Sequence, residues 1–441
     1  MATEGRTQEE QLARNLTATG LWILTINGMI GAGIFGVPAE AARLTGVFSP
    51  LMFVFCGLIM APVILAHGEV ASYFRGTGGP ILYTRAAFGP FFAFQTGWAL
   101  YVARVTAFAA NLNLLVSSVA YFWPAIETGG GRVALLFAIC GSLTWINVAG
   151  VRHAVAAMGV LTVLKLTPLV LLVALGLGYV TPETLPLGTA EWPVRSDFGA
   201  AALLLIYAFV GWEGTLIPAG EAKNPARDMP RALLWALLVA TVLYALIQAV
   251  SVAVLPDLAE SQRPLVDVAD ALVGPVGALI LTAGVVVSVG GNVAGTVITA
   301  PRVTYALARD GLLPQWLGGV HPRYLTPHQS IVFFGIIAFG LAVWGSFAWL
   351  AGMSSVVRLA VYVLSIACLP ALRRKLGPPP VRLPGGLLIP AIAILVCLWL
   401  LAQVTLRPVL VTLGFLAVGM ALYTLAPAAR RRAPENPGRD R

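Results

Sequence analysis

The chain has 441 residues, of which 28 are Lys or Arg and 19 are Asp or Glu, so only 11% are charged. An ordinary soluble domain carries about 25% charged residues, whereas here 58% of the residues are hydrophobic and the mean hydropathy is +0.85. So few charges cannot cover a water-exposed surface, which excludes a soluble globule, and the hydrophobicity excludes a disordered chain. The composition predicts an all-α, polytopic membrane protein.

Apolar segments of about 20 residues, the length of a membrane-spanning helix, recur along nearly the whole chain. We expect about twelve spans, near residues 16–46, 48–74, 88–123, 132–150, 154–180, 198–222, 229–255, 274–306, 329–349, 350–371, 386–406 and 407–426. The polar ends, residues 1–15 and 427–441, are expected to be an N-terminal segment and a basic tail outside the membrane. The four cysteines lie within apolar runs and lack C-x-x-C spacing, so we predict small core residues rather than metal ligands or disulfides.

Basic residues gather in alternate loops. If the N-terminus is cytoplasmic, about 20 of the 28 Lys and Arg residues fall on the cytoplasmic side, and most loop carboxylates fall on the other side. The opposite orientation breaks the positive-inside rule at nearly every loop. We therefore expect a multi-pass protein of the plasma membrane, the inner membrane in a bacterium, with both termini in the cytoplasm. The net charge of +9 does not indicate a nucleic-acid partner, because these residues lie in short breaks between apolar runs.

Two of the expected spans contain glycines where a membrane helix should be continuous. The first span includes GMIGAGIFGVP over residues 28–38, and the sixth includes FVGWEG over residues 209–214. Each leads five spans, over residues 16–180 and 198–371, and the two sets start on opposite sides of the membrane. Matched interruptions of this kind indicate an inverted-repeat transporter whose binding site lies at the breaks. For either segment alone, close helix packing is the alternative explanation.

A broken helix offers two kinds of binding group. The start of one half-helix has free N–H groups and partial positive charge, which suit a carboxylate. The freed carbonyls at the end of the other half can accept an ammonium group or a cation. Glycine permits both the irregular backbone and the close approach of a ligand. One zwitterion can therefore be held without a charged side chain.

Four motifs follow one another along the chain: GAGIF at 31–35, TGGPILY at 77–83 with AFGP at 87–90, GEAKNP at 220–225 with PR at 230–231, and APR at 300–302 with ARDGLLP at 308–314. In this order they resemble the motifs of the amino acid–polyamine–organocation (APC) superfamily of transporters. The resemblance covers helices 1 to 10 and, more weakly, the last two. It implies a five-plus-five inverted repeat with helices 1 and 6 unwound around a central site, two further helices at 386–426, and amino acids or their amines as substrates.

The resemblance also implies roles for particular residues. The backbone around Ala32 and Gly33 would receive the substrate carboxylate. Carbonyls near Met29 and from Phe209 to Gly211 would receive the α-amino group, with Tyr207 covering the substrate. The family often has Ser at the position of Ala32, so carboxylate binding here would rest on the backbone. The implied substrate-binding residues are Met29, Gly31, Ala32, Gly33, Tyr207, Phe209, Val210 and Gly211, and the candidate coupling residues are Lys165 and Glu213.

Lys165 lies well inside the span at 154–180, in the sequence TVLK at 162–165. This resembles sodium-independent relatives, in which a lysine takes the place of a bound sodium ion and links helix 5 to the unwound part of helix 1. Because burial disfavours the charged form of a lysine, Lys165 could also lose and regain a proton, and a permanently charged strut is the alternative. Glu213 lies in the second break, where it either relays a proton or anchors the loop through freed N–H groups.

Other polar residues within the spans have simpler expectations. Arg104 is deep in helix 3 and needs a partner, for which Glu213 and a substrate carboxylate are the candidates. Arg358 and Glu69 are expected nearer span ends, where snorkelling suffices. His67 is predicted to be a core or interfacial histidine, and no metal or other cofactor is expected.

These features predict a secondary active transporter, or permease, that moves amino acids or related amines by alternating access without sodium and with proton coupling as one mode. An exchanger without proton coupling and a transporter-like amino acid sensor are the alternatives. Because the sequence shows no nucleophile with a base, metal motif or P-loop, neither an enzyme nor an ATP-driven pump is expected. The expected partners are the substrate, protons and the lipid bilayer, without nucleic acid. The identity of the substrate, the coupling mode and the oligomeric state stay open.

Overall fold

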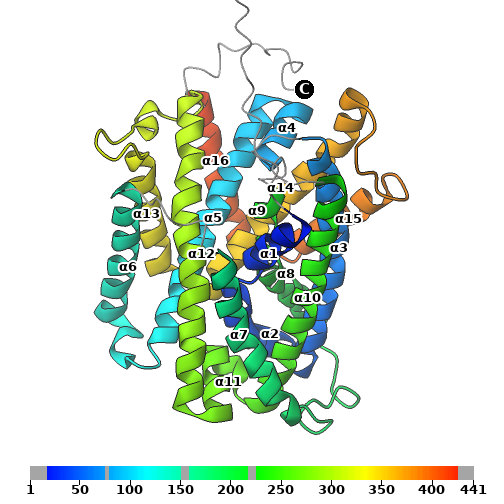
Figure 1. The fold of residues 1–441 in the computed structure, drawn as a ribbon, viewed down its shortest axis with the longest axis vertical. Coiled ribbons are helices and arrows are strands. Elements are labelled where there is room, and N and C mark those ends of the chain that lie inside the picture. The colour runs from blue at the N-terminus through cyan, green and yellow to red at the C-terminus, as the bar shows by residue number, and fades with distance from the viewer. Residues whose placement is uncertain (1–16, 75–78, 150–157, 217–224, 426–441) are drawn as a thin grey trace, which may run out of the picture.

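The computed structural model describes residues 17–74, 79–149, 158–216 and 225–425 (Figure 1). Across these ranges every regular element is a helix, which confirms the prediction of an all-α fold. The polar ends expected at 1–15 and 427–441 lie outside the described residues, as do parts of the motifs at 77–83 and 220–225.

The helices follow the order of the expected spans. They are α1 (Ala18–Met29), α2 (Ala32–Thr45), α3 (Ser49–Ser72), α4 (Pro80–Phe88), α5 (Pro90–Val119), α6 (Gly129–Ala149), α7 (Met158–Gly176), α8 (Arg195–Phe209), α9 (Glu213–Leu216), α10 (Pro225–Val254), α11 (Pro264–Val273), α12 (Pro275–Arg309), α13 (His328–Trp344), α14 (Phe347–Leu376), α15 (Leu388–Leu401) and α16 (Leu406–Leu425). Seven described helical segments are long and apolar enough to cross a membrane, and four shorter apolar helices accompany them. The protein is a multi-pass membrane protein.

The first and sixth expected spans are each built from two helices. Helix α1 ends at Met29 and α2 begins at Ala32, while α8 ends at Phe209 and α9 begins at Glu213. The glycine-containing interruptions are therefore real breaks in the helices, as the sequence predicted.

Two short helices, α4 and α11, lie between the spans. The hydropathy pattern did not distinguish them from the long helices α5 and α12 that follow them. Each begins at a proline and is followed by a glycine with positive φ, Gly89 at +92° and Gly274 at +69°. Proline is favoured at the first helical position, and glycine accepts the backbone turn that ends a helix.

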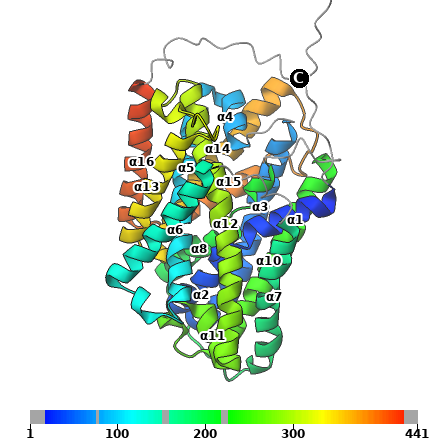
Figure 2. The ribbon, with the colours of Figure 1, turned by 60° about the vertical axis from the view of Figure 1, so that its left-hand side comes forward.

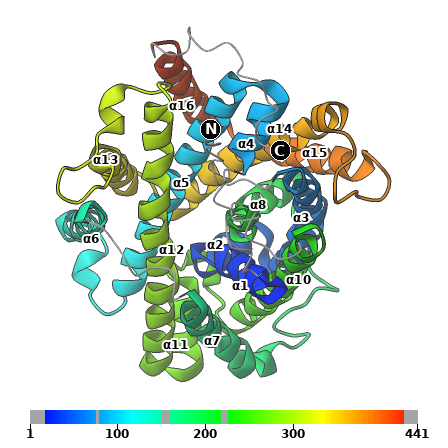
Figure 3. The same cartoon turned by 45° about the horizontal axis from the view of Figure 1, so that its top comes forward.

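The helices form one bundle, with α4 at one end and α11 at the other (Figure 1), and we call these ends the α4 side and the α11 side. Helix α5 is the most buried of the described spans, and it packs against α12 and α14. Helices α2 and α8 pack on each other near the middle of the bundle (Figure 3). Helix α1 instead runs obliquely at the edge, against α10 (Figure 2). The two breaks therefore lie where a central pair of half-helices meets the surrounding bundle.

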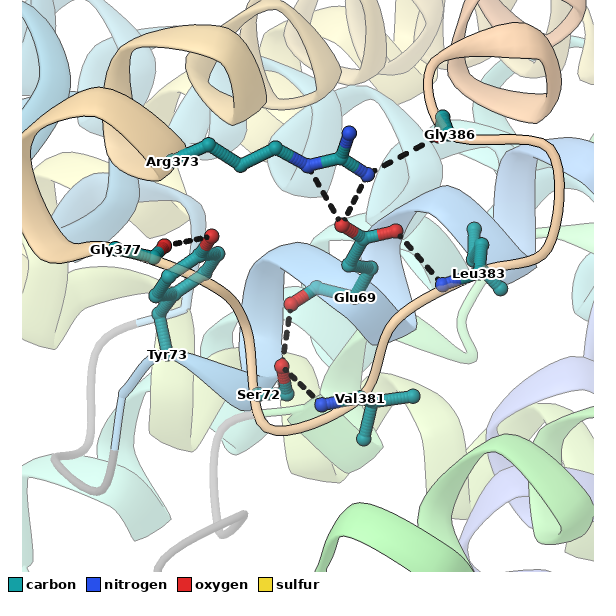
Figure 4. Close-up of polar contacts among 8 residues, drawn as sticks. All are labelled: Glu69, Ser72, Tyr73, Arg373, Gly377, Val381, Leu383 and Gly386. Atoms are coloured by element: carbon teal, nitrogen blue, oxygen red, sulfur yellow. Dashed lines mark hydrogen bonds and ion pairs between the residues drawn. The ribbon is translucent and has the colours of Figure 1, made fainter.

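A buried ion pair ties α3 to the end of α14 on the α4 side (Figure 4). Glu69 is fully buried and accepts hydrogen bonds from Arg373, through Nε at 3.0 Å and Nη2 at 2.5 Å, and from the Leu383 backbone N–H at 3.2 Å. Nearby, the Tyr73 hydroxyl donates to the Gly377 carbonyl at 2.9 Å. The expectation that Glu69 snorkels to the interface is wrong, because the segment after α14 folds over this carboxylate and a buried charge then requires a partner.

The other predicted core residues are buried. All four cysteines are free thiols inside the protein. His67 is fully buried with its ring against Trp212 and Tyr362, and its Nδ1–H donates to the Val63 carbonyl at 2.9 Å. Its prediction as a core histidine is confirmed.

Candidate functional site

The two breaks touch each other through their glycines. A Cβ atom on Gly28 would lie 2.6 Å from the carbonyl oxygen of Gly211, and a Cβ on Gly211 would overlap the carbonyl of Gly28. Gly211 also has φ of +104°, a backbone conformation that side chains disfavour. Contact between the two backbones, together with this torsion, requires glycine at Gly211 and strongly favours it at Gly28.

The start of α2 presents free backbone N–H groups. Gly31 precedes the helix, and no side chain caps it. The N–H groups of the first turn, at Ala32 and Gly33, have no acceptor inside an α-helix and lie at its partially positive end. Gly33 also has a packing role, because a Cβ there would lie 2.5 Å from the Cα of Ala208 in α8. The packing explanation therefore applies to Gly33, while its N–H group stays available at the start of the helix.

The end of α8 presents free carbonyls. The chain leaves the helix at Val210, which is extended, and the carbonyls of Phe209 and Val210 accept no hydrogen bond from any residue that the structure describes. The Phe209 side chain packs into the core against Phe53 and Tyr244, so this residue offers the site only its backbone.

The carbonyls at the end of α1 are, in contrast, already occupied. The Lys165 ammonium, on α7, donates to the carbonyls of Asn27 at 2.6 Å and Ile30 at 2.7 Å. The Met29 carbonyl accepts from the Tyr244 hydroxyl at 3.1 Å and from the Gly31 N–H at 3.0 Å. The lysine thus links α7 to the first break. Tyr244 was not found from the sequence, because a tyrosine on an apolar helix has no distinguishing pattern.

Glu213 links the second break to α14 through hydrogen bonds and an ion pair. Its Oε2 accepts from the Gly211 N–H at 2.8 Å and from the Tyr362 hydroxyl at 3.1 Å, and its Oε1 forms an ion pair with Arg358. The expectation that Arg358 lies near a span end and snorkels is wrong, since it is the partner of a buried carboxylate in the break. A carboxylate removed from water requires such a partner.

A chain of polar side chains crosses the site toward α2. The Tyr207 hydroxyl donates to Asn111 Oδ1 at 2.8 Å, and Asn111 Nδ2 donates to Asn292 Oδ1 at 3.0 Å. The Asn292 amide in turn lies 3.3 Å from the position of a Cβ on Gly31. The Tyr207 ring packs edge-on against Phe347, with ring centroids 5.9 Å apart. Sequence reasoning missed Asn292, although an amide after two glycines in an apolar span was a usable signal.

Arg104 is half-buried on α5 and has no hydrogen bond or ion pair with any residue in the described ranges. The suggestion that it pairs with Glu213 is wrong, because Arg358 holds that carboxylate. In the same parts of the chain, no three His, Cys, Asp or Glu side chains gather where they could hold a metal ion.

Comparison with known proteins gives a consistent assignment. Residues 16–426 match the family model described as amino acid permease. The chain is 29% identical to the branched-chain amino acid permease BcaP of Bacillus subtilis, over 96% of this chain and 94% of that protein. It is 28% identical to the methylthioribose transporter of the same organism, over 95% of each chain. It is also 28% identical to the serine/threonine exchanger SteT of B. subtilis, over 74% of this chain and 76% of that protein.

Proposed function

Because the chain belongs to the amino acid permease family, we propose that it is a secondary active transporter that moves amino acids or related amines across the plasma membrane by alternating access. The observation that carries the proposal is the meeting of the two breaks, where free N–H groups at the start of α2 accompany free carbonyls at the end of α8. Opposite partial charges on two facing half-helices are what a zwitterion requires.

The substrate carboxylate is held by the backbone at Gly31, Ala32 and Gly33, chiefly by the N–H groups of Ala32 and Gly33, because no side chain caps the helix and the Gly31 N–H already donates to the Met29 carbonyl. The α-amino group is held by the carbonyls of Phe209 and Val210, with less from Gly211, whose carbonyl accepts from the Gly214 N–H at 3.2 Å. Met29 contributes less, because its carbonyl already has two donors. Tyr207, held by its hydrogen bond to α5, covers the substrate.

Transport is independent of sodium, because the Lys165 ammonium supplies a positive charge to the carbonyls of the first break. Lys165 is also the better candidate for a proton carrier than Glu213. The Glu213 carboxylate is paired with Arg358, whereas the Lys165 ammonium is held only by backbone carbonyls. Exchange without proton coupling is the second candidate, because the related SteT is an exchanger.

The expected orientation, with both termini in the cytoplasm, places the α4 side of the bundle inside the cell. The basic residues Arg373, Arg374 and Lys375 at the end of α14 support this orientation. The transporter domain extends over residues 16–426, with repeats at about 16–180 and 198–371 followed by the helices at 386–426, and the extent of the family match supports the outer bounds.

A thermal-shift screen of the purified protein against amino acids and polyamines tests the substrate class, because a bound ligand raises the melting temperature. Counterflow of a labelled hit into proteoliposomes then tests transport. Binding without counterflow would favour the sensor, and the absence of any hit would contradict the proposed substrate class. Uptake should be unchanged when choline replaces sodium and should rise as the outside pH falls. A sodium requirement would refute the role of Lys165 as a substitute for sodium. Uptake that does not change with pH would favour exchange without proton coupling.

A further inference from the structure

Arg104 lies beside the site and is partly accessible on a helix whose surroundings are buried. Between residues 96 and 116 of α5, only Arg104 and Ala107 are not fully buried. The Ala103 carbonyl accepts from Ser354 of α14 at 2.8 Å, and the Ala107 carbonyl lies 3.4 Å from the Tyr207 hydroxyl of α8. Arg104 is thus on the part of α5 that lies between α14 and α8. It also shares a helix face with Asn111, two turns further on.

Positive charges outnumber negative charges around Arg104 among the described residues. Arg358 forms an ion pair with Glu213, and its Nε donates to Ser354 Oγ at 3.3 Å. Ser354, which Arg358 contacts, donates to the carbonyl of Ala103, the residue before Arg104, so the two positive charges lie on neighbouring parts of α14 and α5. With Lys165 bound to carbonyls, the part of the site that the structure describes has three cations and one carboxylate. A guanidinium away from water, beside a like charge and without a partner, is costly until an anion neutralises it.

The chemistry of Arg104 selects the kind of anion. A guanidinium presents a planar fork of donors that matches a carboxylate with two parallel hydrogen bonds. The α-carboxylate of an amino acid is already assigned to the start of α2, where backbone N–H groups suffice. The anion that remains for Arg104 is therefore a second carboxylate, on the side chain of the substrate.

We propose that Arg104 is a specificity-determining residue that binds the side-chain carboxylate of an acidic amino acid, such as aspartate or glutamate. This inference rests on the proposed amino acid transport. Glutamate and glutamine have nearly the same shape and differ in this charge, so a site with an unpaired arginine separates them. Loss of a hydrogen-bonded charge costs about 1.5–3 kcal/mol, which corresponds to about 10- to 100-fold in affinity.

The experiment measures competition by glutamate, glutamine, aspartate and asparagine in thermal-shift and counterflow assays. In the unmodified protein, each acid should bind at least about 10-fold more tightly than its amide. Arg104→Gln should weaken binding of the acids more than binding of the amides and so remove that preference, and Arg104→Lys should restore part of it. Arg309→Gln, which removes an exposed arginine at the end of α12, is the matched control and should keep the preference.

Several results would overturn the proposal. Equal binding of acids and amides by the unmodified protein would do so without any variant, so the test does not depend on the folding of Arg104→Gln. An equal loss of acids and amides in Arg104→Gln would assign Arg104 to the α-carboxylate instead. Transport of neutral amino acids alone would refute this inference and leave the proposed function intact, whereas no binding of any amino acid would refute both.

Discussion

Replacing Gly211 by alanine tests the contact between the two breaks. The added methyl would sit on a residue with φ of +104° and would overlap the Gly28 carbonyl. A strained backbone of this kind costs about 1–3 kcal/mol, and a forced overlap in a packed interior costs about 1–3 kcal/mol more. We therefore expect Gly211→Ala to lower the free energy of unfolding by about 2–6 kcal/mol.

The assay is thermal unfolding of the purified protein in detergent, with and without substrate. Gly214→Ala is the matched control, because Gly214 lies three residues further on, is exposed, and has no atom within 4 Å of an added Cβ. An alanine in a helix gains about 0.5–1 kcal/mol over glycine, so the control should be as stable as the unmodified protein or slightly more stable. Gly28→Ala has ordinary torsions and should fall between the two, since it meets only the Gly211 carbonyl.

The two costs also predict a functional result. If Gly211→Ala folds at all, the methyl pushes the breaks apart and the substrate-induced rise in melting temperature should disappear. The reasoning is refuted if Gly211→Ala melts with the Gly214→Ala control and keeps its response to substrate. The breaks would then not be in contact in the folded protein.

Three further outcomes are expected. Lys165→Met should abolish uptake in proteoliposomes, because the carbonyls of Asn27 and Ile30 lose their donor, and retained uptake would contradict this role. Arg373→Ala should destabilise the protein by about 3–5 kcal/mol, since it leaves the Glu69 carboxylate buried and unpaired; Arg374→Ala is the control, and equal melting temperatures would argue against the pair. Tyr207→Phe loses one hydrogen bond, so the free energy of unfolding should fall by only about 0.5–1.5 kcal/mol. The affinity for substrate should weaken as well.

The sequence was sufficient for features that are encoded locally. Membrane spans follow from runs of apolar residues, because the length of a run has to match the thickness of the bilayer. The two breaks follow from glycines in those runs, and Gly211 shows why the signal is dependable: its torsion and its contact both exclude a side chain. The family followed from motifs in a fixed order. None of these inferences required knowledge of which helices touch.

Only the tertiary structure decided which groups are partners. Glu69 and Arg373 are 304 residues apart, and Glu213 meets Tyr362 across 149 residues. No periodicity connects such positions, so the sequence suggested Arg104 for Glu213 where the fold provides Arg358. Burial is likewise a property of the assembled bundle, as the segment that covers Glu69 shows. Local residue types thus determine where the chain crosses the membrane and where it breaks, whereas the pairing of its buried charges depends on packing between distant helices.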